Sequence, residues 1–255
     1  MLYVAFLKDN IMGDNFPGHT QFLDCWLISG TLAITGITTT LSVLSQKTED
    51  YETKTSQDFT LTGISSFKLN GGYLLSAAFV GFVMQMIVFA VMYLYFHLVD
   101  DLQLTDFNFG ALVGIMLLGA GVNAVVNAVL ILFVRNRSTL SAISTIVGTV
   151  SGFLVGAYIP IGVLPEAAQW VVKFTPGAYV AALFRQLFLK NDLEKLFPAN
   201  VRQELAEQLG IQLKWGRLLD YGQTLLVTIG LFGLFLVILV TIEAGLNAQR
   251  QRAKA

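Results

Sequence analysis

The sequence contains little charge. Lysine, arginine, aspartate and glutamate make up 13% of the 255 residues and hydrophobic residues make up 55%, whereas a soluble domain typically carries about 25% charged residues. The apolar residues also form long uncharged blocks instead of following the period of an amphipathic surface helix. This composition excludes an ordinary soluble domain and indicates that lipid surrounds the blocks.

Cysteine and histidine are scarce as well. The single cysteine, Cys25, has no second cysteine for an internal disulfide, and the two histidines, His19 and His97, are far apart in the sequence. The sixteen Lys and Arg residues lie between apolar blocks or in the C-terminal tail and form no basic face. We therefore expect no metal or cofactor on this chain and no nucleic-acid partner.

Motifs of catalysis and phosphate binding are missing too. The sequence has no G-x-x-x-x-G-K-[ST] loop, no H-E-x-x-H and no G-x-S-x-G. We expect that the chain is not an enzyme, so any ATP hydrolysis linked to it belongs to a partner.

Five apolar windows are long enough to cross a bilayer, which requires roughly 20 residues at a rise of about 1.5 Å each. They are residues 22–44, 72–98, 110–134, 139–159 and 221–244. The sequence therefore predicts an all-α, multi-pass membrane protein whose residues 1–255 form a single transmembrane domain.

The charges between these windows predict an orientation, because Lys and Arg are enriched in cytoplasmic loops. They occur in residues 46–70, around Asn136 and in the tail from residue 250, whereas residues 99–109 hold three aspartates and no Lys or Arg. The first three segments are predicted to be cytoplasmic and the aspartate-rich loop external. Five spans then place the start outside and the C-terminus in the cytoplasm.

Residues 160–220 do not fit a simple external loop. Their first part, up to residue 189, is apolar and interrupted by Pro160, Pro165 and Pro176. We predict a re-entrant or interfacial element there, with backbone at membrane depth that protein shelters from lipid. Residues 190–217 mix charge with periodic leucines and predict a short amphipathic helix at the outer surface.

Glycines recur every four residues in the window 139–159, at Gly148, Gly152 and Gly156. This spacing lets helix backbones approach closely in lipid. It favours packing within one chain over a dedicated dimer seam.

Polar side chains inside the windows are functional candidates because they are costly in hydrocarbon. Asn123 and Asn127 are four residues apart and project from one face of a helix. Together with Gln85, they either line a translocation path or bond to a neighbouring helix, and we favour the bond. Asp24 and Glu243 lie near predicted helix ends, where we expect water to reach them.

In residues 46–70, charged residues give way to spaced apolar ones. One interpretation is a solvated loop with a helix on the inner membrane surface. The other is a short helix whose apolar residues dock into a groove on a cytoplasmic partner.

Two stretches resemble the ABC-2 type permeases of bacterial exporters. The first resembles the segment that leads from the family's coupling helix into the next membrane helix, and it consists of Asp58, Phe59, Ser65, Ser66, Phe67, Lys68 and Tyr73. The second and more specific one resembles the block after the fifth span, which forms re-entrant external helices in the family. It consists of GAYIPIGVLP at 156–165 with Trp170, Pro176, Tyr179 and Arg185. With the spacing of the spans, the resemblance covers nearly the whole chain.

The resemblance implies a permease subunit of an ATP-driven exporter in the bacterial plasma membrane, moving a lipophilic or amphipathic substrate such as a drug or antimicrobial peptide outward. It also implies a second permease chain and a separate cytoplasmic ATPase subunit that holds ATP and magnesium. The contact with that subunit is expected at Asp58, Phe59, Leu61 and Phe67. A non-transporting scaffold or immunity protein and an ion-coupled secondary carrier remain as alternatives.

Family members generally have six spans and two cytoplasmic ends. Residues 2–10 resemble the last turns of a first span and its external loop. We therefore expect the native start to lie upstream of Met1.

Overall fold

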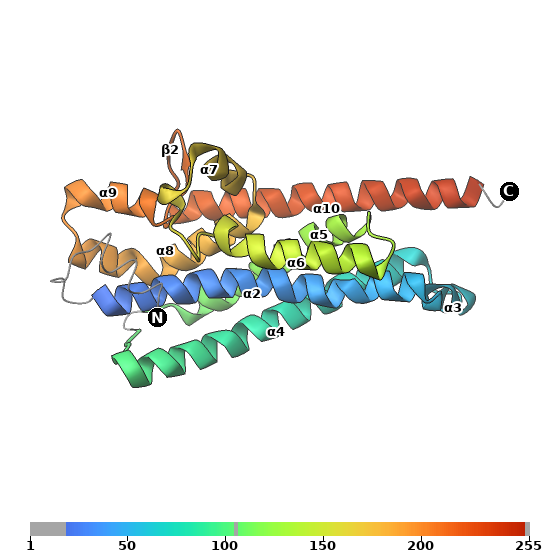
Figure 1. Cartoon of the computed structure of the whole chain (residues 1–255), viewed down its shortest axis with the longest axis horizontal. Coiled ribbons are helices and arrows are strands. Elements are labelled where there is room, and N and C mark those ends of the chain that lie inside the picture. Colours follow the sequence, from blue (N-terminus) through green and yellow to red (C-terminus); the bar gives the residue numbers. More distant parts are fainter. Residues whose placement is uncertain (1–18, 105–106, 253–255) are drawn as a thin grey trace.

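The computed structural model describes residues 19–104 and 107–252 and consists almost entirely of helices (Figure 1). Four of them are long and apolar enough to cross a membrane: α2 (His19–Glu52), α4 (Ser66–Asp100), α5 (Phe109–Ile131) and α10 (Tyr221–Arg252). This confirms the predicted all-α, multi-pass membrane protein. The expectation about residues 2–10 lies outside the described residues.

The predicted span at residues 139–159 is wrong in its extent. Helix α6 (Arg137–Leu154) has 18 residues and ends at Leu154, and it is not among the four apolar candidates. Its hydropathy is diluted by serines and threonines, of which Thr145 and Thr149 donate back to carbonyls one turn earlier. Beyond its end the chain turns at Gly156, whose φ of 66° is left-handed, so the helix cannot continue.

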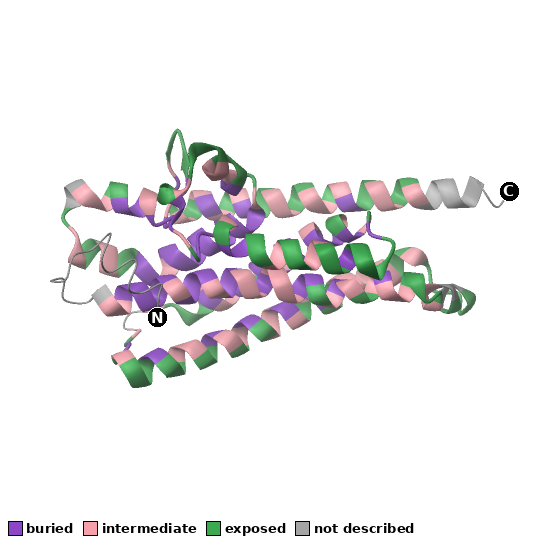
Figure 2. Ribbon diagram, in the orientation of Figure 1, coloured by how far each residue is buried: buried purple, intermediate pink, exposed green. Residues whose placement is uncertain are grey.

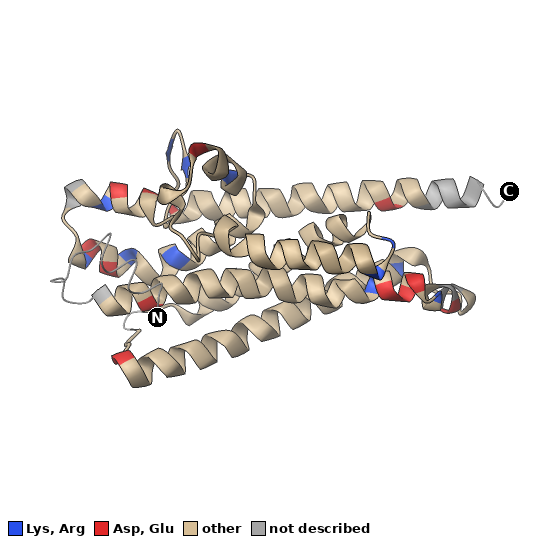
Figure 3. Ribbon diagram, in the orientation of Figure 1, with Lys and Arg blue, Asp and Glu red and all other residues tan. Residues whose placement is uncertain are grey.

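The long helices run along the length of the molecule, with α2 in contact with α4, α5, α6 and α8 (Figure 1). The short helix α3 (Thr55–Leu61) and the last residues of α10 lie at one end of the bundle, which we call the α3 end. Charged residues gather toward the two ends, and the helices between carry almost none (Figure 3). This distribution matches a bundle whose middle lies in lipid.

The segment between α6 and α10 folds into several short elements. They are η2 (Ile161–Val163), α7 (Glu166–Lys173), α8 (Pro176–Leu196), α9 (Ala199–Gln208), and the strands β1 (Lys214–Trp215) and β2 (Arg217–Leu218), which pair as an antiparallel hairpin. The prediction of one amphipathic helix over residues 190–217 is therefore wrong. Pro198 and the left-handed Gly210 and Gly216 divide the stretch into the end of α8, α9 and the hairpin.

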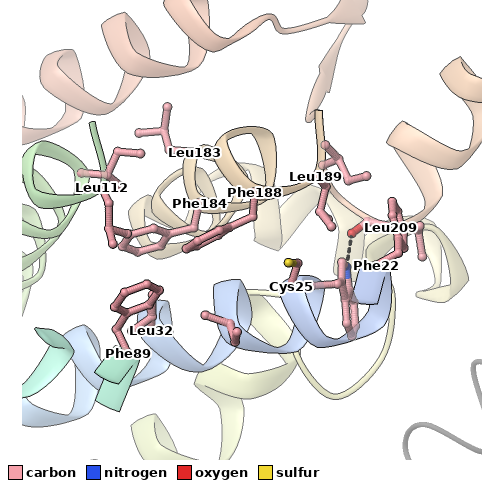
Figure 4. Close-up of a cluster of buried hydrophobic side chains, with 14 of the residues drawn as sticks. Phe22, Cys25, Leu32, Phe89, Leu112, Leu183, Phe184, Phe188, Leu189 and Leu209 are labelled. Atoms are coloured by element: carbon pink, nitrogen blue, oxygen red, sulfur yellow. Dashed lines mark hydrogen bonds between the residues drawn. The ribbon is translucent and has the colours of Figure 1, made fainter. Parts of the chain in front are cut away.

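Burial is concentrated in α2, α5 and α8, whereas α10 exposes much of its surface (Figure 2). The largest apolar cluster lies toward the end away from α3, where Phe184 and Phe188 of α8 approach Phe89 of α4 (Figure 4). The rings of Phe89 and Phe188 are stacked with centroids 6.0 Å apart. Helix α8 is therefore an internal element of the bundle and not a surface loop.

Candidate functional site

The α3 end is a helical hairpin built on the extension of α2. Helix α2 continues to Glu52, Lys54 then adopts a left-handed φ of 64°, and α3 follows. After Gly63, with a φ of 80°, Ser65 caps α4 by accepting from the backbone N–H of Lys68. The sequence therefore turns twice within a few residues and presents α3 at the tip.

The predicted coupling residues lie at this tip. Asp58 and Phe59 are on α3, Leu61 is its last residue and Phe67 is in the first turn of α4. The exposed fractions are 86% for Leu61 and 70% for Phe67, and Asp58 is exposed as well. Large apolar side chains therefore remain uncovered in a segment that also carries charge.

Acidic residues at the end of α2 hold the neighbouring helices to this tip. Arg137, the first residue of α6, pairs with Glu49, and its backbone N–H donates to Glu52 Oε2 at 3.0 Å. The hydroxyl of Tyr73 on α4 donates to Asp50. The last turns of α2 are thus linked to both α4 and α6.

A fourth link reaches α10 and is better protected from water. Lys47 Nζ lies 3.1 Å from Glu243 Oε1, with side-chain exposures of 23% and 13%. The pair borders a mainly apolar cavity of about 100 Å³ between α2, α4, α5 and α10. Glu243 was predicted from sequence to reach water, but its partner, 196 residues away, gave no signal in the sequence.

Polar side chains of α4 and α5 bond to α2 in the middle of the bundle. Gln85 Nε2 donates to the carbonyl of Leu32 at 3.0 Å. Asn127 Nδ2 donates to the carbonyl of Ile37 at 2.9 Å and to Thr40 Oγ1 at 2.8 Å. These bonds are interhelical, and those to the Leu32 carbonyl and to Thr40 Oγ1 are buried, so they constrain how α2 packs against its neighbours.

Gly36 of α2 allows these amides to approach. A Cβ atom there would lie 2.7 Å from Gln85 Nε2 and 2.8 Å from Asn123 Nδ2, which is closer than packing permits. Asn123 is 3% exposed and so lies inside the same junction. Gly36 and Thr40 could not be identified from the sequence, because one glycine and one threonine in a threonine-rich window carry no distinct signal.

Arg185 lies at the centre of the segment that the sequence predicted to be re-entrant. Its side chain is fully buried, and Nη2 donates at 2.8 Å to the carbonyls of both Val155 and Gly156. Nη1 donates to the carbonyl of Gly210 at 3.2 Å, and the guanidinium lies 4.9 Å from the ring centroid of Trp26. One side chain of α8 therefore joins the turn after α6, the turn after α9 and helix α2.

Aromatic residues and prolines complete this segment. Tyr179 donates its hydroxyl to the carbonyl of Lys173 at 2.6 Å and accepts from Trp215 Nε1 at 2.7 Å. The prolines fix the starts of the short helices, since Pro160 precedes η2, Pro165 precedes α7 and Pro176 is the first residue of α8.

The three glycines predicted to share one helix face do not do so. Gly156 lies beyond the end of α6, in a turn. A Cβ on Gly152 would lie 2.1 Å from the ring of Tyr158, whereas a Cβ on Gly148 would meet nothing within 4 Å. The four-residue spacing is therefore not a continuous packing groove, because the helix ends before the third glycine.

Asp24 was also predicted to reach water. It lies two turns or less from the start of α2 but is only 4% exposed, in a helix whose flanking residues Leu23 and Cys25 belong to the main apolar cluster. The prediction is wrong because this part of α2 packs into the bundle, where Trp26 contacts Arg185 and donates to the carbonyl of Leu209.

The described residues contain no group of three or more His, Cys, Asp or Glu side chains placed to hold a metal ion. A family model of ABC-2 family transporter proteins matches residues 11–242. No curated protein and no solved structure matches the chain. The family match spans all of the candidate membrane helices up to Ile242 of α10, so it includes both the α3 end and the segment around Arg185. The chain therefore belongs to the ABC-2 family of transporter proteins.

Proposed function

We propose that this chain is the permease subunit of an ATP-driven exporter and that a separate ATPase subunit docks on its α3 end. The observation that carries the proposal is the uncovered apolar surface at Leu61 and Phe67, on the tip of a helical hairpin. A tip of this kind matches the recognition mode in which apolar residues of a short helix enter a groove on a partner.

The polar links of the α3 end support a role in transmitting movement. Residues of α2 bond to Tyr73 of α4, Arg137 of α6 and Glu243 of α10. A displacement of α3 by a docked subunit is therefore passed to four helices together. ATP supplies the bias because it binds the closed arrangement of the ATPase subunits more tightly than the open one.

The remaining parts of the proposal follow from the family and from the charge pattern. ATP and magnesium belong to the ATPase subunit, and a second permease chain completes the path for a lipophilic or amphipathic substrate that moves outward. Lys54 and Lys68 flank α3 in the chain, and Arg135 and Arg137 lie just before and at the start of α6, where Arg137 pairs with Glu49. This supports a cytoplasmic α3 end and C-terminus in a bacterial plasma membrane.

Co-purification with the proposed ATPase subunit tests the docking contact. We expect Leu61→Asp to weaken pairing by thirtyfold or more, since a central apolar anchor contributes about 2 kcal/mol or more. Leu98→Asp is the matched control, because Leu98 is 75% exposed at the other end of α4. Equal pairing of the wild type and the Leu61 variant would refute this contact.

Transport by the paired complex in vesicles separates the exporter from its alternatives. Uptake into inside-out vesicles should require ATP and persist when ion gradients are dissipated. Uptake that needs a gradient instead of ATP identifies a secondary carrier, and pairing without any uptake identifies a scaffold.

A further inference from the structure

Three aromatic residues form a surface cluster next to α10. Trp170 and Phe174 lie on α7, and Trp215 lies on β1. The ring of Trp215 meets those of Trp170 and Phe174 edge-on, with centroids 6.2 and 5.9 Å apart. We call these three residues the aromatic patch.

The aromatic patch remains open to its surroundings. The exposed fractions are 54% for Trp170, 66% for Phe174 and 43% for Trp215. Soluble surfaces seldom expose so many large apolar side chains together. The patch therefore belongs against an apolar or amphipathic medium.

Cations flank the rings. Lys173 Nζ lies 4.8 Å from the centroid of the Trp170 ring. Arg217 is exposed and stands directly opposite Trp215 in the hairpin. The nearby Lys214 forms an exposed ion pair with Glu207 at 2.8 Å. Aromatic rings beside Lys and Arg are the composition found where a protein crosses the headgroup region of a membrane.

The position of the patch fits this composition. The hairpin ends at Leu218, and α10 begins three residues later at Tyr221. The candidate span of α10, Tyr221–Leu246, has 26 residues and exposes apolar side chains along its length, including Leu226 and Leu234. At about 1.5 Å per residue it is longer than the roughly 30 Å of hydrocarbon, so at least one of its ends reaches the headgroup level, and the end at Tyr221 adjoins the hairpin. The patch is therefore continuous with a lipid-facing surface.

We propose that the aromatic patch anchors the chain in the phospholipid headgroup region of the leaflet opposite the α3 end. The rings of Trp170, Phe174 and Trp215 lie among the upper acyl carbons, and Lys173 and Arg217 meet lipid phosphates. This contact fixes the depth of α7 and the hairpin, and with them the segment that Arg185 holds. It does not depend on docking of an ATPase subunit or on the direction of transport.

The three tryptophans of the chain make a direct test possible. Trp26 is 1% exposed, so Trp170 and Trp215 report on the patch. The full chain in bilayers is compared with a Trp170→Phe, Trp215→Phe variant, using phospholipids brominated near the headgroup or near the chain end. We expect headgroup-proximal bromines to quench the wild type at least twice as strongly as terminal ones. The double variant should lose most of this quenching.

A tryptophan placed near the middle of the membrane serves as the control for depth. Leu234 lies near the middle of the α10 span, and Leu234→Trp in the double-variant background should be quenched more by the chain-end bromines. Lys173→Gln and Arg217→Gln each remove one cation. Each substitution should lower the preference for brominated phosphatidylglycerol over brominated phosphatidylcholine by up to about fivefold.

Two outcomes overturn the proposal. If aqueous iodide quenches the wild type strongly and brominated lipid does not, the patch faces water. If neither quenches it and an introduced cysteine at Val171 crosslinks two chains, a second copy of this chain covers the patch.

Discussion

Replacement of Arg185 by methionine tests how the segment after α6 is held. The substitution keeps an unbranched side chain but removes the donors to the carbonyls of Val155, Gly156 and Gly210. Each buried acceptor that loses its partner costs about 1–3 kcal/mol. Part of this is offset because the guanidinium no longer has to be buried, which recovers several kcal/mol. We expect a net loss of about 3 kcal/mol in the free energy of unfolding.

For a chain of this size, a loss of about 3 kcal/mol lowers the Tm by roughly 6–12 °C. The assay is the temperature at which half of the purified protein in nanodiscs leaves the monodisperse peak. Arg185→Lys should recover only part of the loss, because one ammonium group does not reproduce the planar fork of the guanidinium.

Arg202 provides the matched control. It also donates to two backbone carbonyls, those of Phe197 and Glu194, each at 2.6 Å, but it is partly exposed and water can replace it. We expect Arg202→Met to cost less than about 1 kcal/mol. If the Arg185 and Arg202 variants lose the same stability, the reasoning that the buried acceptors dominate is refuted.

Three further predictions use the same assay. Gly36→Ala should lower stability by about 1–3 kcal/mol because its Cβ would meet two amide nitrogens within 2.8 Å; Gly148→Ala, where the Cβ meets nothing within 4 Å, should raise it by up to about 1 kcal/mol, and equal effects would contradict the packing argument. Lys47→Met should cost about 2 kcal/mol because it leaves the largely shielded Glu243 without its cation, and adding Glu243→Leu should restore most of that, whereas a purely additive double variant would contradict the pairing. Burial raises the pKa of Asp192 and Lys195 opposes this, so the ionised carboxylate lowers the stability of the folded state as pH rises. Asp192→Asn should therefore stabilise the protein at pH 8 by under about 1 kcal/mol and leave it unchanged at pH 4, and an equal gain at pH 4 would contradict this reasoning.

The membrane helices with uninterrupted apolar windows could be predicted from sequence because lipid selects for composition alone. Helix α5 has no charged residue, and the span of α10 has only Glu243, so their existence follows from hydropathy. The end of α6 could not be predicted in this way. It depends on a left-handed turn at Gly156, and the presence of a glycine in the sequence does not determine its φ angle.

The burial of polar residues in α8 could not be predicted from the sequence. Arg185 and Gln186 are polar residues in the stretch predicted to be re-entrant or interfacial, and both are buried. Their partners, which include the carbonyls of Gly210 and Ile211, are 25 residues away in the chain. Polar side chains that are satisfied by distant backbone groups look like surface residues until the fold is known.

The exposure of Leu61 and Phe67 at the α3 end followed more readily from the pattern of charged and spaced apolar residues. The links behind that tip did not, because the pairs Lys47 with Glu243 and Arg137 with Glu49 join distant helices. A single sequence contains the charges but not their pairing.

Helix α2 is one unbroken rod of 34 residues, which is about 51 Å long. Gln85 and Asn127 bond to it near its middle, and Arg185 of α8 packs against Trp26 near its start. At its last turns it contacts Tyr73 of α4, Arg137 of α6 and Glu243 of α10. A rod held at mid-length turns about that point, so its two ends move in opposite directions. A tilt of about 5° displaces each end by roughly 2 Å on these dimensions. A displacement of this size at the α3 end would therefore move the other end of α2, which packs against Arg185, by a similar distance in the opposite direction.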